Sequence, residues 1–292
     1  MTLLLAIPNV SEGRDDTAIG AIAGAFGDLL LDVHRDHDHH RSVFTLAGAP
    51  GSLAPAVLAG AREALERVDV ALHEGIHPRV GAIDVAPIVY LDDADRGAAC
   101  AEALVLADLL GDQLELPVFL YGALAADRTR AELRRGGPAA LAARVAAGEL
   151  TPDFGPRRLH PRGGAVLVAA RAPLVAFNVE LAAPATLLDA QRIAARIREG
   201  GPDGLPGVRA IGLWLDQLAL AQVSTNVEDH RASTLADVVA AVAQHAPVSG
   251  AELVGLAPRT AFRGFPEDVP VRGKRILEDV LADLRPTRTQ AD

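Results

Sequence analysis

Histidine is the residue type best able to do chemistry in this sequence, and it is concentrated in two segments. Residues 34–41 read HRDHDHHR and hold four of the nine histidines. Imidazole and carboxylate groups together can bind a transition metal. The same composition is typical of a polar loop between two strands, so both interpretations stay open for this segment.

The second segment, HEGIH at residues 73–77, matches the H-E-x-x-H pattern of zinc proteases. That pattern needs a helix, where residues four apart share one face. Gly75 weakens a helix, and Pro78 disfavours helical angles at His77. We therefore expect a helix to end near Gly75 and a loop to follow.

His77 begins the segment HPRVGAID at residues 77–84. A proline-stiffened turn attached to a buried strand is a good position for a catalytic group. Imidazole titrates near neutral pH and can act as both general acid and general base. A histidine in a loop is also often only a surface residue, so this segment alone does not decide the function.

Periodicity predicts two successive β-α-β-β-α-β patterns, which are typical of ferredoxin-like sandwiches. The expected elements of the first pattern are 3–8 (strand), 15–26 (helix), 29–33 and 42–47 (strands), 53–72 (helix) and 83–91 (strand). Those of the second are 174–181 (strand), 185–199 (helix), 208–215 and 219–224 (strands), 235–245 (helix) and 252–256 (strand). We predict an α/β (α+β) protein with subdomains at 1–178 and 179–292 and a ligand groove between them.

The composition excludes several classes of function. The net charge of −10 argues against binding to nucleic acid or to anionic membranes. Lys274 is the single lysine, which argues against Schiff-base chemistry and a P-loop, and Cys100 is the single cysteine, which excludes an internal disulfide. The first residues lack a basic leader and no apolar run is long enough to span a bilayer, so we expect a cytoplasmic protein.

Eight segments in order give a more specific indication. They are IPNVSEG at 7–13, LDV at 31–33, RSVFT at 41–45, Gly75 with HPRVGAIDV at 77–85, PVFLYG at 117–122, PDFGP at 152–156, AFN at 176–178 and AQVSTN at 221–226. Together they resemble the glutamate formiminotransferase family. The resemblance implies transfer of the formimino group from N-formimino-L-glutamate to tetrahydrofolate as co-substrate, without a metal, in a homodimer.

The resemblance also implies roles for individual residues. His77 stands at the position of the family's catalytic histidine. The segment that matches the family's folate-binding stretch is Arg162, Gly163, Gly164, Ala165, Val166, Leu167, Val168, Ala169, Ala170 and Arg171. Because both substrates carry carboxylates, which arginine binds bidentately, we expect substrate contacts from arginines and from residues near the same strand end. The expected substrate-binding residues are Asn9, Ser11, Glu12, His40, Arg41 and Arg79.

Four positions depart from the family pattern: His34, His40, Ile76 and Gly163. Three hypotheses therefore follow from the sequence. The first is a metal-independent formiminotransferase. The second is a metal-dependent hydrolase that uses the histidine-rich loop, and the third is a folate-binding relative with altered catalysis.

Overall fold

The computed structural model describes residues 2–75, 78–126 and 128–283. The chain forms two compact units, residues 1–172 and 173–292. The predicted boundary at residue 178 falls inside strand β8 (Val175–Leu181), whose partner strands β10 and β11 all belong to the second unit.

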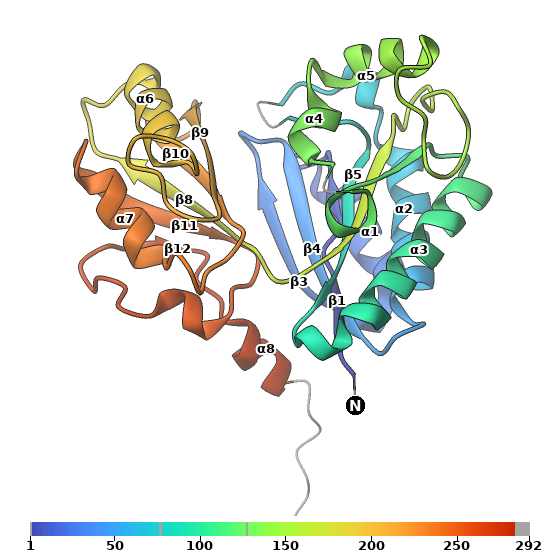
Figure 1. The fold of residues 1–292 in the computed structure, drawn as a ribbon, viewed down its shortest axis with the longest axis horizontal. Helices are drawn as coiled ribbons and strands as arrows, with labels where there is room; N and C mark the ends of the chain where they lie inside the picture. The colour runs from blue at the N-terminus through green and yellow to red at the C-terminus, as the bar shows by residue number, and fades with distance from the viewer. Residues whose placement is uncertain (1, 76–77, 127, 284–292) are drawn as a thin grey trace, which may run out of the picture. The chain divides into compact units, whose positions relative to one another are not determined.

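The first unit is built on a seven-stranded sheet in the order β3-β4-β1-β5-β7-β6 (Figure 1). The short strand β2 follows β1 and pairs with the same two neighbours, β4 and β5. The strands are β1 (Leu4–Ala6), β2 (Asn9–Val10), β3 (Leu30–Asp36), β4 (Arg41–Gly48), β5 (Ile83–Tyr90), β6 (Val118–Leu120) and β7 (Val166–Arg171). The antiparallel part, β3-β4-β1-β5, has the ferredoxin-like order that the element pattern predicts. β7 and β6 extend this sheet as parallel strands beyond β5.

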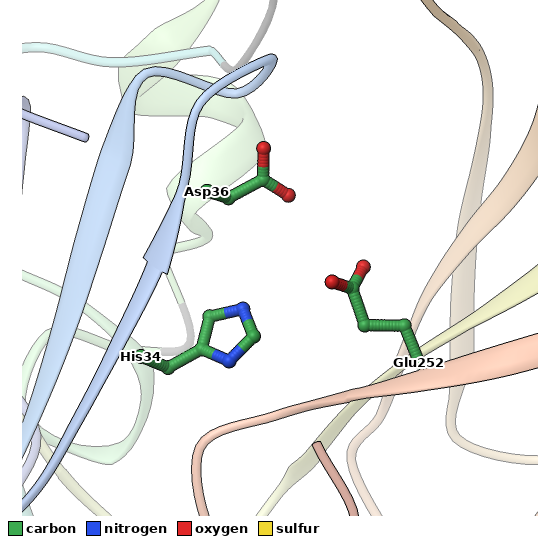
Figure 2. A group of neighbouring side chains, drawn as sticks. All are labelled: His34, Asp36 and Glu252. Carbon is green, nitrogen blue, oxygen red and sulfur yellow. The ribbon is translucent and has the colours of Figure 1, made fainter. Parts of the chain in front are cut away.

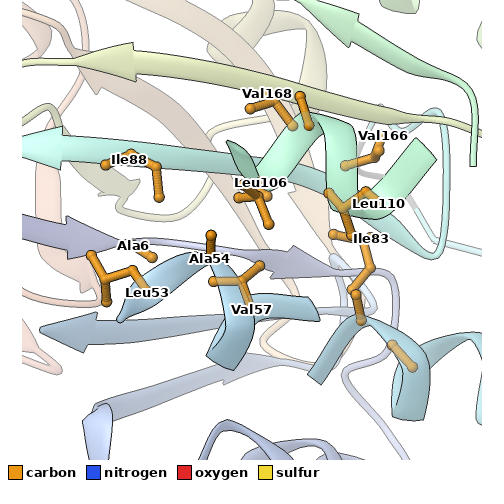
Figure 3. Close-up of a cluster of buried hydrophobic side chains, with 14 of the residues drawn as sticks. Ala6, Leu53, Ala54, Val57, Ile83, Ile88, Leu106, Leu110, Val166 and Val168 are labelled. Carbon is orange, nitrogen blue, oxygen red and sulfur yellow. The ribbon is translucent and has the colours of Figure 1, made fainter. Parts of the chain in front are cut away.

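Helices cover both faces of this sheet. They are α1 (Asp16–Phe26), α2 (Leu53–Arg67), α3 (Arg96–Gln113), α4 (Arg130–Arg134) and α5 (Gly137–Ala146). α1, α2 and α3 bury apolar side chains against one face, where Val57 and Leu106 meet Ile88 and Val168 (Figure 3). Residues of α4 and α5 pack in a second cluster with the alternate side chains of β5 and β7.

The second unit repeats the ferredoxin-like pattern. Its five-stranded sheet has the order β12-β11-β8-β10-β9. The elements not yet given are α6 (Leu187–Ile197), β9 (Val208–Leu215), β10 (Leu220–Val227), α7 (Leu235–Ala243), β11 (Val248–Val254), β12 (Val271–Arg272) and α8 (Leu277–Asp283). α6 and α7 share one apolar cluster with Phe177, Val179, Val223 and Leu253 of the sheet.

Most predicted element bounds differ from the structure by a few residues, and two differences are the largest. The helix predicted for 53–72 ends at Arg67, because Val68 adopts extended angles and Asp69 caps a short 3₁₀ turn over Val70–Leu72. The strand predicted from 252 starts at Val248, with a bulge before Gly250 that masks the alternating pattern. Within the described residues, no helix is long and apolar enough to cross a membrane.

Candidate functional site

The predicted catalytic residue His77 and its neighbour Ile76 lie outside the described residues. The flanking residues can be described. His73, Glu74 and Gly75 are not helical; His73 follows the 3₁₀ turn with φ −78° and ψ 125°. These three residues therefore lack the helical geometry that the zinc-protease motif requires.

The chain that follows Pro78 is fixed by hydrogen bonds from three directions. Ser11 Oγ donates to the Gly81 carbonyl at 2.7 Å, and Ala82 N donates to the Gly163 carbonyl at 2.9 Å. Ala165 N donates to the Val80 carbonyl at 3.0 Å. A Cβ at Gly81 would lie 1.8 Å from the Ala165 carbonyl oxygen, so only glycine allows this close approach.

A buried carboxylate, Asp84 on β5, holds the same segment. Val80 N donates to Asp84 Oδ1 at 2.8 Å, while Arg134 of α4 donates to Asp84 Oδ2. Arg79 extends back along the chain and donates to the Gly75 carbonyl at 3.0 Å and to the His73 carbonyl. Burial lowers the pKa of Arg79 and the Asp84 charge raises it. Arg79 thus connects the two described flanks of residues 76–77.

His40 joins this arrangement from the turn that links β3 to β4, and Glu12 joins it from the segment between β2 and α1. Gly13 N donates to His40 Nδ1 at 3.1 Å, and the His40 ring stacks on His73 with centroids 4.2 Å apart. His73 Nε2 lies 2.9 Å from the His40 carbonyl oxygen. Ser42 Oγ donates to the Glu12 carbonyl at 2.6 Å. Four predicted residues, Ser11, Glu12, His40 and Arg79, are therefore brought together near the described residues 73–75 and 78–81.

His40 is a neutral imidazole in this environment. Burial and the nearby charge of His73 lower its pKa to about 4, although Glu12 raises it. Glu12 Oε1 lies 3.4 Å from His40 Nδ1 but accepts the backbone N–H groups of Arg14 and Asp15. Because Nδ1 accepts from Gly13 N, the ring proton is assigned to Nε2, which makes His40 a hydrogen-bond donor.

The other residues of the histidine-rich segment lie on a hairpin rather than in a long loop. His34 and Asp36 project from β3, two residues apart, and Figure 2 shows both side chains. Asp36 Oδ2 lies 2.7 Å from His39 Nδ1. Burial raises the pKa of Asp36, but its hydrogen bonds to His39 outweigh this and hold the value at about 2. Asp36 is therefore an ionised partner of His39.

Two further predicted substrate-binding residues lie on neighbouring strands. Asn9 is on β2, paired with Val43 and Val85, and its side-chain amide donates to the Ile7 carbonyl at 3.1 Å. Arg41 begins β4 opposite Asp36, and its charge contributes to the lowered pKa of that carboxyl.

The predicted folate-binding stretch is largely a core strand. Val166, Val168 and Ala170 belong to the cluster with α1–α3, and Ala165, Leu167 and Ala169 belong to the cluster with α4 and α5. At its start, Gly163 and Gly164 contact the Val80–Ala82 segment, and Gly164 has a positive φ of 67°. Arg162 lies in the preceding turn and forms an exposed ion pair with Asp69.

Arg171 lies at the opposite end of the sheet from the cluster formed by Ser11, Glu12, His40 and Arg79. Val10 pairs with Ile83 at one end of β5, whereas Arg171 pairs with Val89 near the other. Six residues of strand span about 20 Å. The structure therefore separates the two ends of the predicted stretch, and only its N-terminal end adjoins the cluster.

Sequence reasoning missed three polar residues in the second unit: Asn178, Gln222 and Glu252. They are buried on adjacent strands and hydrogen-bonded to one another. Polar residues that alternate with apolar ones within these three strands were the available signal. Their convergence depends on strand register, which the sequence alone does not give.

Comparisons with known proteins match both units. Residues 3–171 match the N-terminal subdomain of the formiminotransferase domain, and residues 176–264 match the formiminotransferase domain. Since the first match alone covers more than half of the chain, the protein belongs to the formiminotransferase domain family.

Named relatives agree with this assignment. The chain is 35% identical over 268 residues to the glutamate formimidoyltransferase of Streptococcus pyogenes, covering 88% of this chain and 89% of that protein. It is 31% identical over 276 residues to the enzyme of that name from Thermoplasma acidophilum, covering 90% of each. It is 38% identical over 279 residues to the formimidoyltransferase-cyclodeaminase of Sus scrofa, covering 89% of this chain. The chain spans about half, 51%, of that bifunctional protein and of others with its name.

Proposed function

We propose that the protein is a glutamate formimidoyltransferase, which transfers the formimino group from N-formimino-L-glutamate to tetrahydrofolate. The observation that carries the proposal is that both units match the family, together with two relatives of that name that align over nearly all of their length. Tetrahydrofolate is the co-substrate, and the products are 5-formiminotetrahydrofolate and L-glutamate.

The reaction requires a group that both accepts and donates a proton. The folate N5 attacks the formimino carbon, and the imidazole of His77 takes the proton that N5 loses. The same imidazole then protonates the glutamate nitrogen as its bond to the formimino carbon breaks. A group with a pKa near neutrality suits both steps. The hydrogen bonds of Arg79, Ser11 and Asp84 support this role because they fix the chain on either side of His77.

Substrate contacts are assigned to the residues around this histidine. Ser11 donates to the Gly81 carbonyl, His40 and Arg79 contact His73, and Glu12 lies beside His40. The neutral His40 ring offers an Nε2–H donor. Asn9 and Arg41 extend the same end of the sheet, where Arg41 supplies positive charge for a carboxylate. For the folate, we assign charge contact to Arg162 and Arg171, because the backbone N–H and C=O groups of Gly163 and Gly164 already form hydrogen bonds with Ala82 and His160.

We also propose that the protein is a homodimer. Strand β9 is the edge strand of the second sheet and contains neither proline nor lysine, two common protections of an exposed edge. Its Ile211 and Trp214 side chains are exposed. Antiparallel pairing of two copies of β9 brings the Arg209 end of one strand to the Asp216 end of the other. The measurement is the molar mass in solution, with Ile211→Lys expected to yield monomers.

The test of the activity is glutamate release from N-formimino-L-glutamate by purified, chelator-treated protein, with and without tetrahydrofolate. Release that requires tetrahydrofolate is expected. Release without it, lost on chelation and restored by zinc, would instead identify a metal-dependent hydrolase. Folate binding without release would identify a relative with altered catalysis.

A further inference from the structure

A cluster of buried polar side chains lies on one face of the second sheet. Phe177, Val179, Val223 and Leu253 of β8, β10 and β11 face helices α6 and α7. Side chains alternate along a strand, so their neighbours Asn178, Gln222 and Glu252 point to the opposite face. The register places them close together, because Glu252 pairs with Asn178 and Gln222 pairs with Glu180.

These side chains share one carboxylate. Asn178 Nδ2 donates to Glu252 Oε2 at 2.9 Å, and Gln222 Nε2 donates to the same oxygen at 3.4 Å. Figure 2 shows Glu252 projecting from β11. Arg272 of β12 lies 3.3 Å from Glu252 Oε1 and also donates to Glu180 Oε1, from Nε at 3.1 Å. The Arg272 guanidinium thus contacts the carboxylates of both Glu180 and Glu252.

One acceptor of this cluster has no partner. Among the described residues, nothing hydrogen-bonds to Gln222 Oε1, although Gln222 is fully buried, with 0% of its surface exposed. A buried carbonyl left without a donor costs about 1–3 kcal/mol. Valine would suit this position in β10 without that cost, so packing alone does not explain a glutamine here.

We propose that this face binds a ligand through a planar group of the amidine type. In such a group one carbon joins two nitrogens, and both nitrogens donate N–H hydrogen bonds. Gln222 Oε1 accepts one N–H, and the Glu252 carboxylate supplies the negative charge and acceptor oxygens for the other. Carboxylates pair well with such two-pronged donors. The inference rests on the proposed function, because both of its substrates carry this N–C–N group: the formimino group of the donor and the aminopyrimidinone ring of the folate.

The test measures equilibrium binding without turnover. Isothermal titration of the full chain with N-formimino-L-glutamate alone, with folic acid alone and with formamidinium gives three dissociation constants. The variant Gln222→Met keeps the side-chain volume and removes the orphaned carbonyl. We expect it to weaken formamidinium and at least one of the two substrate-like ligands at least tenfold. The ligand that weakens identifies which N–C–N group the site takes.

Two controls separate binding from folding. Gln191→Met makes the same substitution at an exposed position of α6, and its dissociation constants should equal those of the wild type. Thermal unfolding of Gln222→Met without ligand should not fall below that of the wild type, because the variant removes an unpaired buried acceptor. A lower melting temperature with unchanged binding would show a purely structural role and overturn the inference. If Gln222→Met does not fold, Glu252→Gln, which removes the charge at constant shape, should weaken the same ligands.

The remaining outcomes are equally decisive. Wild-type protein that binds none of the three ligands, or a Gln222→Met variant with all constants within twofold of wild type, would contradict the inference. Absence of formimino transfer with folic acid binding still sensitive to Gln222→Met would overturn the proposed function and leave the site standing. Normal formimino transfer, together with ligand binding that Gln222→Met does not change, would overturn the inference and leave the proposed function standing.

Discussion

The rings of His40 and His73 stack 4.2 Å apart, and His73 Nε2 lies 2.9 Å from the His40 carbonyl oxygen. His40 adopts a positive φ of 48°, which only glycine, asparagine and a few other residues tolerate well. This turn therefore places a neutral imidazole next to Glu12 and Arg79 at a local conformational cost. The resulting contacts have measurable consequences for stability and for activity.

Acid should destabilise the protein through His40. Its pKa is about 4 in the folded chain, lowered by burial and by His73, Arg14 and Arg79, against a raising effect of Glu12. The unfolded chain binds a proton at about 6.5, so stability is retained above that pH and lost as pH falls toward 4. A variant without the His40 imidazole should have a free energy of unfolding about 1–2 kcal/mol higher than that of the wild type at pH 5.

The variant that tests this is His40→Asn, because asparagine tolerates the positive φ and can accept from Gly13 N. Urea unfolding at pH 7.5 and 5.0 should show similar stabilities at the higher pH and the predicted difference at the lower. His37→Asn, an exposed histidine in the same turn, is the control. Equal losses of stability in wild type and His40→Asn between these pH values would refute the assignment.

Arg79 offers a test of how the flanks of His77 are held. Its guanidinium donates hydrogen bonds to the backbone carbonyls of His73 and Gly75. Lysine cannot reproduce this fork, so Arg79→Lys should lower kcat at least tenfold and, because Arg79 is also a proposed substrate contact, raise KM for N-formimino-L-glutamate. Steady-state kinetics with Arg62→Lys as a surface control would check this. A rise in KM at constant kcat would contradict the role of Arg79 in holding the flanks of His77.

The limits of sequence reasoning are visible in particular elements. Alternation and length identified β9 as Val208–Leu215, with the bounds found in the structure, and the order of elements predicted both ferredoxin-like sheets. Periodicity did not reveal that Val68 would leave the helix, since its neighbours continue the apolar pattern. The sequence pointed to Ser11, Glu12, His40 and Arg79 separately. Their meeting near residues 73–75 and 78–81 depends on the β2–β4–β5 register, and no local pattern encodes it.

Glu102 provides a stability test in the first unit. This buried carboxylate of α3 accepts the Ala54 N–H at 2.7 Å and the Gly51 N–H at the start of α2, where Ser52 makes no side-chain cap. Glu102→Ala leaves these donors without a partner and should cost about 2 kcal/mol. Chemical denaturation would measure it. Glu63→Ala, which removes a partly exposed ion pair with Arg67, should cost less than about 0.5 kcal/mol; equal losses would show that Glu102 has no capping role.

The assignment of His77 makes the sharpest prediction about activity. His77→Ala removes the group that carries the proton between the two nitrogens, so kcat should fall by about 10²–10⁴. Folic acid affinity should stay within threefold, since His77 is not one of the proposed folate-binding residues, and added imidazole should restore part of the rate. His37→Ala should retain full activity. A His77→Ala enzyme that keeps its rate, or one whose loss is explained by weaker folate binding alone, would move the proton-transfer role to another residue. His73, whose pKa is lowered by burial, would then be the next residue to replace.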